Sequence, residues 1–363
     1  MAEVTREIVE EAIKGYTEPH MEKNLIAAKC LKGVEIDGDR VSVKIELGFP
    51  ADGFVEELAA AVKGMVEAVD GVAAASVDVG WKVVAHSVQK SLKPIDNVKN
   101  IIAVASGKGG VGKSTTAVNL ALALAAEGGR VGLLDADIYG PSQPRMLGVS
   151  GQPESKDGKT LEPMENYGLQ AMSIGFLVDE ETPMIWRGPM VTQALEQLLN
   201  DTNWSDLDYL IIDLPPGTGD TQLTLAQKVP VSGAVIVTTP QDIALLDARK
   251  GFKMFEKVEV PVLGIVENMS IHICSQCGHE EHIFGEGGGT RMAQQYGVDF
   301  LGALPLDIRI REETDGGKPT VVAEPESRIA QIYREIGRKT AAKLALQSKS
   351  YAAKFPNIVI QNN

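Results

Sequence analysis

The residues with the most specific chemistry form a glycine-rich loop. Residues 106–115 read SGKGGVGKST and fit the phosphate-loop pattern G-x-x-x-x-G-K-[ST], with a second lysine near the start. A β-rich apolar run (101–105) precedes the loop and a helical pattern (113–126) follows it, which is the order that a phosphate loop requires. We expect loop N–H groups and the helix N-terminus to hold a polyphosphate. The expected nucleotide-binding residues of this loop are Gly107, Lys108, Gly109, Gly110, Val111, Gly112, Lys113, Ser114 and Thr115.

Side chains in and near the loop have separate expected roles. Lys113 should pair with the β- and γ-phosphates, and the Ser114 hydroxyl should ligate Mg²⁺. Asp213 ends the apolar run 207–213, where a P-loop enzyme places a carboxylate to hold Mg²⁺ or its water. The Pro- and Gly-rich segment 215–220 follows and is either a loop that senses the γ-phosphate or a plain turn.

Two carboxylates follow another apolar run. Asp135 and Asp137 lie at and just beyond the end of residues 130–135, and one of them could orient the attacking water. Phosphoryl transfer depends on positioning and charge stabilisation, so a water-holding carboxylate with two lysines and Mg²⁺ is sufficient. We therefore expect Lys108, Lys113, Asp137 and Asp213 to be the catalytic residues; a solvated turn at Asp137 is the alternative.

A pair of cysteines forms a second candidate site. Cys274 and Cys277 have the spacing at which two thiolates bind one metal centre, and a C₂ dimer would supply two more. Four cysteines suit either Zn²⁺ or a [4Fe-4S] cluster. Free thiols are one alternative, and a site that adds His279 and His282 is another, although H-x-x-H is shorter than the usual zinc spacing. Cys30 is expected to be a small core residue in a strand.

Composition limits the classes of protein that the chain can belong to. It has 363 residues, a formal net charge of -14 at pH 7 and three cysteines. The charge disfavours nucleic acid and anionic lipid as partners, and the few cysteines exclude a disulfide framework. No apolar run approaches the ~18 residues of a spanning helix, and residues 1–15 show no export or transit signal. We expect a cytoplasmic protein with no nucleic-acid partner and no stable membrane association.

Hydrophobic periodicity predicts two domains. Residues 1–85 should form a small α+β domain with helices at 3–15 and 52–69 and strands at 25–36, 41–47 and 72–79; residues 86–99 should be a linker. Residues 100–346 should form an α/β P-loop domain, and 347–363 a tail. Its mostly parallel sheet, covered by helices on both faces, should use the runs 101–105, 130–135, 207–213, 233–239, 260–266 and 299–304. Asp135, Asp213, Thr239 and Asn268 end such runs and should gather around the phosphate loop.

These motifs resemble a known family. GKGGVGKST is similar to the deviant Walker A sequence of the class that includes MinD, ParA and the nitrogenase iron protein. Five further motifs resemble those of the Mrp-type iron–sulfur carrier subgroup. They are DADIYGPS at 135–142, WRGPM at 186–190, DLPPGTGD at 213–220, ENMS at 267–270 and the C-x-x-C at 274–277. This resemblance covers about residues 99–346, and residues 1–85 resemble the small assembly domain often fused before it. The usual Asp-Pro-Glu of that domain reads Glu18-Pro19-His20 here.

The resemblance implies a function and further residue roles. It implies an ATP-dependent carrier that holds a [4Fe-4S] cluster between the subunits of a homodimer and transfers it to apo-proteins, with scaffold proteins as further partners. It also implies that Lys108 acts on the partner's nucleotide, that Asp137 positions water, and that Asn268 and residues 305–307 adjoin adenine.

Two other functions remain open at this point. A positioning or partitioning ATPase should carry a basic amphipathic extension, for which Lys339, Lys343, Lys349 and Lys354 give some support. A reductase with a permanent bridging cluster should carry its cysteines in two separated segments, whereas those of the C-x-x-C motif are adjacent.

Overall fold

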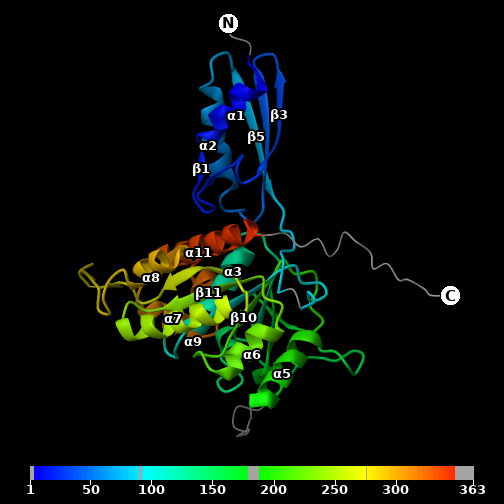
Figure 1. The fold of residues 1–363 in the computed structure, drawn as a ribbon, viewed down its shortest axis with the longest axis vertical. Helices are drawn as coiled ribbons and strands as arrows, with labels where there is room; N and C mark the ends of the chain where they lie inside the picture. The colour runs from blue at the N-terminus through cyan, green and yellow to red at the C-terminus, as the bar shows by residue number, and fades with distance from the viewer. Residues whose placement is uncertain (1–3, 90–91, 179–187, 275, 348–363) are drawn as a thin grey trace, which may run out of the picture.

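An eight-stranded sheet is the centre of the large domain (Figure 1). The computed structural model describes residues 4–89, 92–178, 188–274 and 276–347. The strand order is β15-β12-β11-β6-β10-β7-β9-β8, and every neighbouring pair is parallel except β8–β9. The strands are β6 (Ile101–Ala105), β7 (Val131–Asp135), β8 (Met164–Asn166), β9 (Leu169–Ser173), β10 (Tyr209–Asp213), β11 (Gly233–Thr238), β12 (Val262–Glu267) and β15 (Phe300–Ala303).

Helices cover both faces of this sheet. The connection from β6 to β7 runs in one direction along the strand order. The connections from β9 to β10, β10 to β11, β11 to β12 and β12 to β15 run in the opposite direction. Because such crossovers are right-handed, the helices of the two sets lie on opposite faces of the sheet. One face carries α3 (Lys113–Ala126), on which α11 (Arg328–Ala345) packs. The other carries α5 (Gly188–Asn200), α6 (Asp220–Lys228), α7 (Asp242–Lys257) and α8 (Gly288–Tyr296). No helix in the part of the chain that the structure describes is long and apolar enough to cross a membrane.

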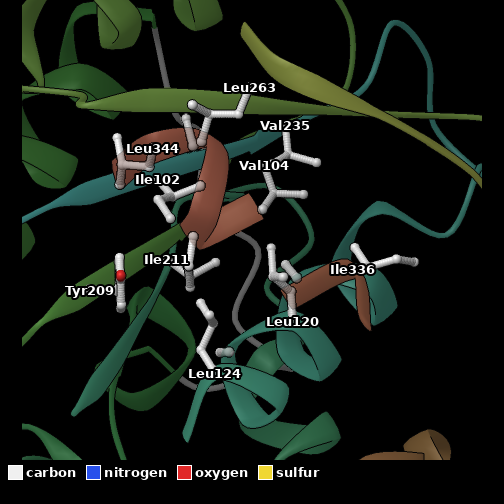
Figure 2. Close-up of a cluster of buried hydrophobic side chains, with 14 of the residues drawn as sticks. Ile102, Val104, Leu120, Leu124, Tyr209, Ile211, Val235, Leu263, Ile336 and Leu344 are labelled. Carbon is white, nitrogen blue, oxygen red and sulfur yellow. The ribbon is translucent and has the colours of Figure 1, made fainter. Parts of the chain in front are cut away.

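Short elements complete the large domain. They are α4 (Gln143–Met146), the 3₁₀ helix η1 (Ile174–Phe176), the hairpin of β13 (His272–Ile273) and β14 (Glu280–Glu281), α9 (Ile308–Asp315) and α10 (Thr320–Ala323). Apolar side chains of the central strands interlock with those of α3 and α11 in the core, as Figure 2 shows for Ile102, Ile211, Leu120 and Ile336. Every residue of β6, β7 and β10 is buried, which is the pattern of a parallel sheet covered on both faces.

The small N-terminal domain is a three-stranded sheet with two helices on it. Strand β4 (Arg40–Leu47) lies between antiparallel β3 (Leu31–Asp37) and parallel β5 (Ala74–Trp81). Helices α1 (Arg6–Lys14) and α2 (Val55–Glu67) pack on each other, and contact β3 and β5 respectively. A separate two-stranded pair, β1 (Thr17–Glu18) and β2 (Lys23–Asn24), follows α1.

The fold differs from the predicted elements in several places. The predicted strand 25–36 begins only at Leu31, because residues 25–29 form turns in which Lys29 has a φ of 60°. Cys30 is buried as predicted, but it precedes β3. Strands β8 and β9 were not predicted; they join through Tyr167 and Gly168, both of which have positive φ. In the predicted linker, Val98 bridges Leu207.

The small domain contacts the far end of α3 and the last helix. Figure 1 shows α11 running beneath the small domain. Glu127, at the C-terminal end of α3, is completely buried and accepts hydrogen bonds from the Gly53 N–H at 2.9 Å and from Arg334 Nε at 2.8 Å. Because the phosphate loop precedes α3, the small domain docks at the end of this helix remote from that loop.

His20 connects the two domains. Its Nδ1 lies 2.6 Å from Glu18 Oε1 and its Nε2 lies 3.1 Å from Glu335 Oε2 on α11. Burial lowers the pKa of His20, but the hydrogen bonds to Glu18 and Glu335 outweigh it, so the net pKa is raised. The hydrogen bond from His20 lowers the pKa of Glu335 to about 2. An imidazolium between two carboxylates therefore joins the domains.

We predict that His20→Gln flattens the pH dependence of stability above pH 6. A histidine whose pKa is raised on folding stabilises the folded state fully at pH values below its unfolded-state pKa. This contribution is lost as pH rises through the folded-state pKa. The contribution of Glu335 to stability is present at pH values above its unfolded-state pKa and is lost as pH falls toward its folded-state pKa of about 2. Urea unfolding between pH 5 and 9 should show the largest wild-type advantage near pH 5–6, about 2 kcal/mol for charge-assisted hydrogen bonds. The exposed His279→Gln is the control, and a pH-independent difference at His20 would contradict the assignment.

Candidate functional site

The glycine loop between β6 and α3 has a backbone that only glycine adopts without strain. Gly110 and Gly112 both have a φ of +80°. At Gly107, an added Cβ would lie 2.1 Å from the backbone carbon of Asp247 in α7, so this glycine permits close packing of the loop on that helix. The loop therefore has the tight form that a phosphate cradle requires.

Lys113 and Asp213 form a buried ion pair at the base of the loop. Lys113 begins α3 and is 6% exposed, and Asp213 ends β10 and is fully buried. The ammonium contacts Asp213 Oδ1 and lies 3.2 Å from Ser114 Oγ. The structure thus brings together the predicted phosphate lysine, the predicted Mg²⁺ ligand and the predicted strand-end carboxylate.

Asp135 organises the loop that follows β7. Its Oδ2 accepts hydrogen bonds from the backbone N–H groups of Ser142 and Gln143 at 2.9 and 3.0 Å, and its Oδ1 accepts one from Asp137 at 3.1 Å. Complete burial, with Asp213 nearby, raises the pKa of Asp135 to about 7. Asp135 is therefore a buried anchor for this loop rather than a group open to a ligand.

Asp137 is the more accessible of the two carboxylates. It is half-buried, and burial raises its pKa while the charge of Lys113 opposes that rise. The charges of Lys113 and Asp213 both act on the pKa of Asp137, and the Asp137 N–H donates to Asp135 at the start of the loop that follows β7. This position suits the water-orienting role that the sequence predicts, and that role stays a prediction.

The segment after β10 packs on the glycine loop. The N–H of Gly217 donates to the Ser106 carbonyl at 3.1 Å, and Gly217 has a φ of +99°. Pro216 lies next to Gly109. The predicted γ-phosphate sensor is thus in direct contact with the loop whose occupancy it would sense.

Lys108 differs from Lys113 in its surroundings. It is half-buried, and its carbonyl accepts a hydrogen bond from Ser106 Oγ at 2.9 Å. Within the described ranges, no carboxylate pairs with the Lys108 ammonium. The Lys108 ammonium therefore lacks the internal carboxylate partner that holds Lys113.

Asn268 connects the glycine loop to the cysteine segment. It follows β12, is 8% exposed, and its Nδ2 donates to the Val111 carbonyl at 2.9 Å. The predicted contact of Asn268 with adenine stays a prediction; the structure shows the contact with the loop backbone. Thr239 directly follows β11 and is buried, with its hydroxyl 2.8 Å from Gln241 Oε1.

The cysteine pair lies on a hairpin just after Asn268. Strands β13 and β14 pair through His272–Glu281 and Ile273–Glu280, and the Gly278 N–H donates to the Cys274 carbonyl at 2.9 Å. Cys274 is half-buried and Cys277 exposed. Hydrogen bonds from the backbone N–H groups of Gln276 and Cys277 lower the pKa of the Cys274 thiol, which favours the thiolate that metals bind.

The histidines near the hairpin do not complete a metal site. His282 Nδ1 lies 2.8 Å from the Ser270 carbonyl, and His279 is exposed. Within the described ranges, no group of three or more His, Cys, Asp or Glu side chains could hold a metal ion. One chain therefore offers two thiols, which is half of a four-ligand site.

Gln143 is a site residue that the sequence did not reveal. It begins α4, is 1% exposed, and its Nε2 donates to the Ser114 carbonyl at 3.1 Å and to Asp213 Oδ2 at 2.9 Å. No local pattern identifies such a residue, because its three hydrogen-bond partners come from three separate segments.

The fold and the glycine loop define the class of protein. A mostly parallel sheet whose first strand leads through a two-lysine glycine loop into a helix is that of a P-loop NTPase. The chain belongs to the family described as NUBPL iron-transfer P-loop NTPase, which matches residues 97–341. The family described as iron-sulfur cluster assembly protein matches residues 6–79.

The named relatives below cover 69–96% of the chain. An Escherichia coli K12 protein named iron-sulfur cluster carrier protein is 51% identical over 353 residues, covering 96% of this chain and 94% of its own length. A Pseudomonas fragi protein of the same name is 63% identical over 269 residues, covering 74% and 94%. The mouse iron-sulfur cluster transfer protein NUBPL is 54% identical over 254 residues, covering 69% and 80%.

Solved structures agree with the fold. A nucleotide-binding protein from Archaeoglobus fulgidus, described in complex with ADP and with Co, is 40% identical with a TM-score of 0.56, covering 64% of this chain and 90% of its own. The cell division ATPase MinD of Pyrococcus furiosus is 22% identical with a TM-score of 0.51, covering 66% and 97%, and this likeness concerns the fold alone.

We predict that Lys113→Ala destabilises the nucleotide-free protein by about 3–5 kcal/mol, because Asp213 is left buried without its cation. The double variant Lys113→Ala, Asp213→Asn should recover part of this loss, since the remaining amide is neutral. Urea unfolding of the two variants measures the difference. Lys63→Ala removes an exposed pair with Glu67 and should cost less than about 1 kcal/mol. Equal stability of the single and double variants would contradict a buried ion pair.

Proposed function

We propose that this chain is an ATP-dependent iron–sulfur cluster carrier, which binds a [4Fe-4S] cluster between the subunits of a homodimer and delivers it to apo-proteins. One observation carries the proposal: Asn268 contacts the glycine loop through Val111, and the thiol pair begins at Cys274 on the same segment. Nucleotide and cluster sites are thereby joined by a short stretch of chain. The names of the relatives support the same cargo.

Exposed apolar side chains on this edge support a homodimer. They follow the carboxyl ends of β7, β11, β12 and β15, and therefore share the sheet edge that carries the glycine loop. Such a group marks a protein-binding surface. Their exposed fractions are 63% for Tyr139, 65% for Ile243, 50% for Leu246, 37% for Ile273, 50% for Ile283 and 62% for Ile308.

A second copy would also complete the two half-sites described above. Two Cys274–Cys277 pairs supply four thiolates, the number that a [4Fe-4S] cluster needs. The Lys108 ammonium, which pairs with no carboxylate in the described part of its own chain, would neutralise phosphate charge on the partner's ATP. A single contact between two subunits would therefore complete both the cysteine site and the nucleotide site.

The same geometry supports ATP hydrolysis. Lys113 would move from Asp213 to the β- and γ-phosphates, and Ser114 and Asp213 would hold Mg²⁺, whose charge neutralises that of the phosphates. Their juxtaposition fits a hydrated Mg²⁺ site. Asp137 would then orient water toward the γ-phosphate. Hydrolysis would relax the dimer contact on which the cluster depends.

The positioning ATPase receives less support from the structure. The apolar residues Ile329, Tyr333 and Ile336 of α11 are buried in the core, so they form no free amphipathic face. Lys339 pairs with Glu335, and Lys343 pairs with Glu22 and Asp299. Lys349 and Lys354 lie outside the described residues, as do residues 186 and 187 of the WRGPM motif.

We predict that Lys113→Ala abolishes ATP turnover, because it removes the phosphate cation. Asp137→Asn should lower kcat about 100-fold or more with little change in ATP affinity, since it alters the water-orienting group alone. Lys108→Ala should lower kcat, and it should also weaken the dependence of kcat on protein concentration. Phosphate release measures all three, with Lys250→Ala on the exposed face of α7 as the control. Retained turnover in Lys113→Ala would refute the ATPase assignment.

We predict that anaerobic reconstitution with iron and sulfide yields about four irons and four sulfides per dimer. The double variant Cys274→Ser, Cys277→Ser should retain neither. Cys30→Ala, in the small domain, should reconstitute like wild type because Cys30 is buried away from the hairpin. Transfer of the cluster to an apo-acceptor then tests the carrier role. Equal iron in the wild type and the double variant, or retention of zinc instead, would refute the shared cluster site.

A further inference from the structure

Gln143 lies where three segments of the nucleotide site meet. Its backbone N–H donates to Asp135, and its side-chain amide donates to the Ser114 carbonyl and to the Asp213 carboxylate. Both side-chain partners are acceptors, so the nitrogen of the amide must face them and the oxygen must point elsewhere. The two amide protons thus bind the start of α3 to the end of β10.

The remaining polar atom of the Gln143 side chain is its amide oxygen, Oε1. Gln143 Oε1 is buried and has no hydrogen-bond partner in the part of the chain that the structure describes, and the same holds for Ser142 Oγ next to it. A buried polar atom without a partner costs free energy, so a donor is expected to reach it in another state of the protein. Hydrated Mg²⁺ carries such donors, and Gln143 contacts the backbone carbonyl of Ser114, the residue whose hydroxyl is the proposed Mg²⁺ ligand.

Nucleotide binding changes what holds Asp213. Among the described residues, Lys113 and Gln143 are the side chains that donate to the Asp213 carboxylate. When Lys113 turns to the phosphates, Gln143 is the donor that remains. The carboxylate then keeps its orientation without a competing positive charge at the metal position.

We propose that Gln143 is a positioning residue for Mg²⁺: it orients Asp213 after Lys113 has left it and accepts a hydrogen bond from a water on the metal through Oε1. The inference rests on the proposed ATP-binding function. Gln143 would therefore contribute to the part of the nucleotide affinity that depends on Mg²⁺, and it would make no direct contact with phosphate.

The test compares binding of a non-hydrolysable ATP analogue in excess Mg²⁺ and in EDTA by calorimetry. In Gln143→Met, which retains the shape but has no amide, the affinity gain from Mg²⁺ should fall about tenfold or more, the size of a lost charge-assisted hydrogen bond. Affinity in EDTA should stay unchanged. Gln152→Met, at an exposed glutamine further along the same segment, is the matched control and should behave as wild type.

A second variant and a second readout keep the outcome decisive. Gln143→Asn is too short to reach both acceptors, and should lose the same Mg²⁺-dependent gain. Mn²⁺ titration of the protein–ADP complex, followed by electron paramagnetic resonance, should show weaker metal binding in both variants. An unchanged Mg²⁺-dependent gain, or equal losses with and without metal, would overturn the proposal while leaving ATP binding intact. Failure of the wild type to bind the analogue would overturn the proposed function as well.

Discussion

The buried ion pair of Lys113 and Asp213 is the contact on which the nucleotide site depends. It joins the first turn of α3 to the end of β10, and Asp135 and Gln143 are arranged around it. A buried pair is strongly destabilised when one partner is removed, so the site needs another anion before Lys113 can leave Asp213. A phosphate group is such an anion. The ion pair therefore makes nucleotide binding an exchange of partners, in which a phosphate replaces Asp213 as the anion beside Lys113.

The sequence was sufficient where the determinants are local. The glycine loop was predicted correctly because the positive φ of Gly110 and Gly112 and the close approach at Gly107 each demand glycine. Asp213 was located because a continuous apolar run marks a strand buried on both faces, and its last residue must lie at the ligand edge. The cysteine pair was equally visible, since both thiols belong to one short turn.

Features that depend on tertiary contacts were not predicted. The turn of Tyr167 and Gly168 lacks the usual Asn-Gly or Asp-Gly signal, so the edge strands β8 and β9 were missed. Residues 25–30 resemble a strand in sequence, yet residues 25–29 form turns next to the small sheet, in which Ala27 and Lys29 are exposed. His20 gave no sign of its role, because its partner Glu335 is more than three hundred positions away. Gln143 is similar: its meaning depends on the meeting of β7, α3 and β10.

The charges at the contact between the domains balance separately on each side. Glu127 is neutralised by Arg334 and Arg338 of its own domain, and Glu18 by His20 and by the backbone N–H groups of His20 and Met21. The ion pairs that cross the boundary, such as Glu22 with Lys343 and His20 with Glu335, involve a carboxylate that already meets water, whereas the hydrogen bond from the Gly53 N–H ends on buried Glu127. If the small domain moved away, neither side would keep a buried charge without a partner. The electrostatic cost of separating the two domains is thus limited to the hydrogen bonds that cross the boundary, such as those of His20 with Glu335 and of Gly53 with Glu127.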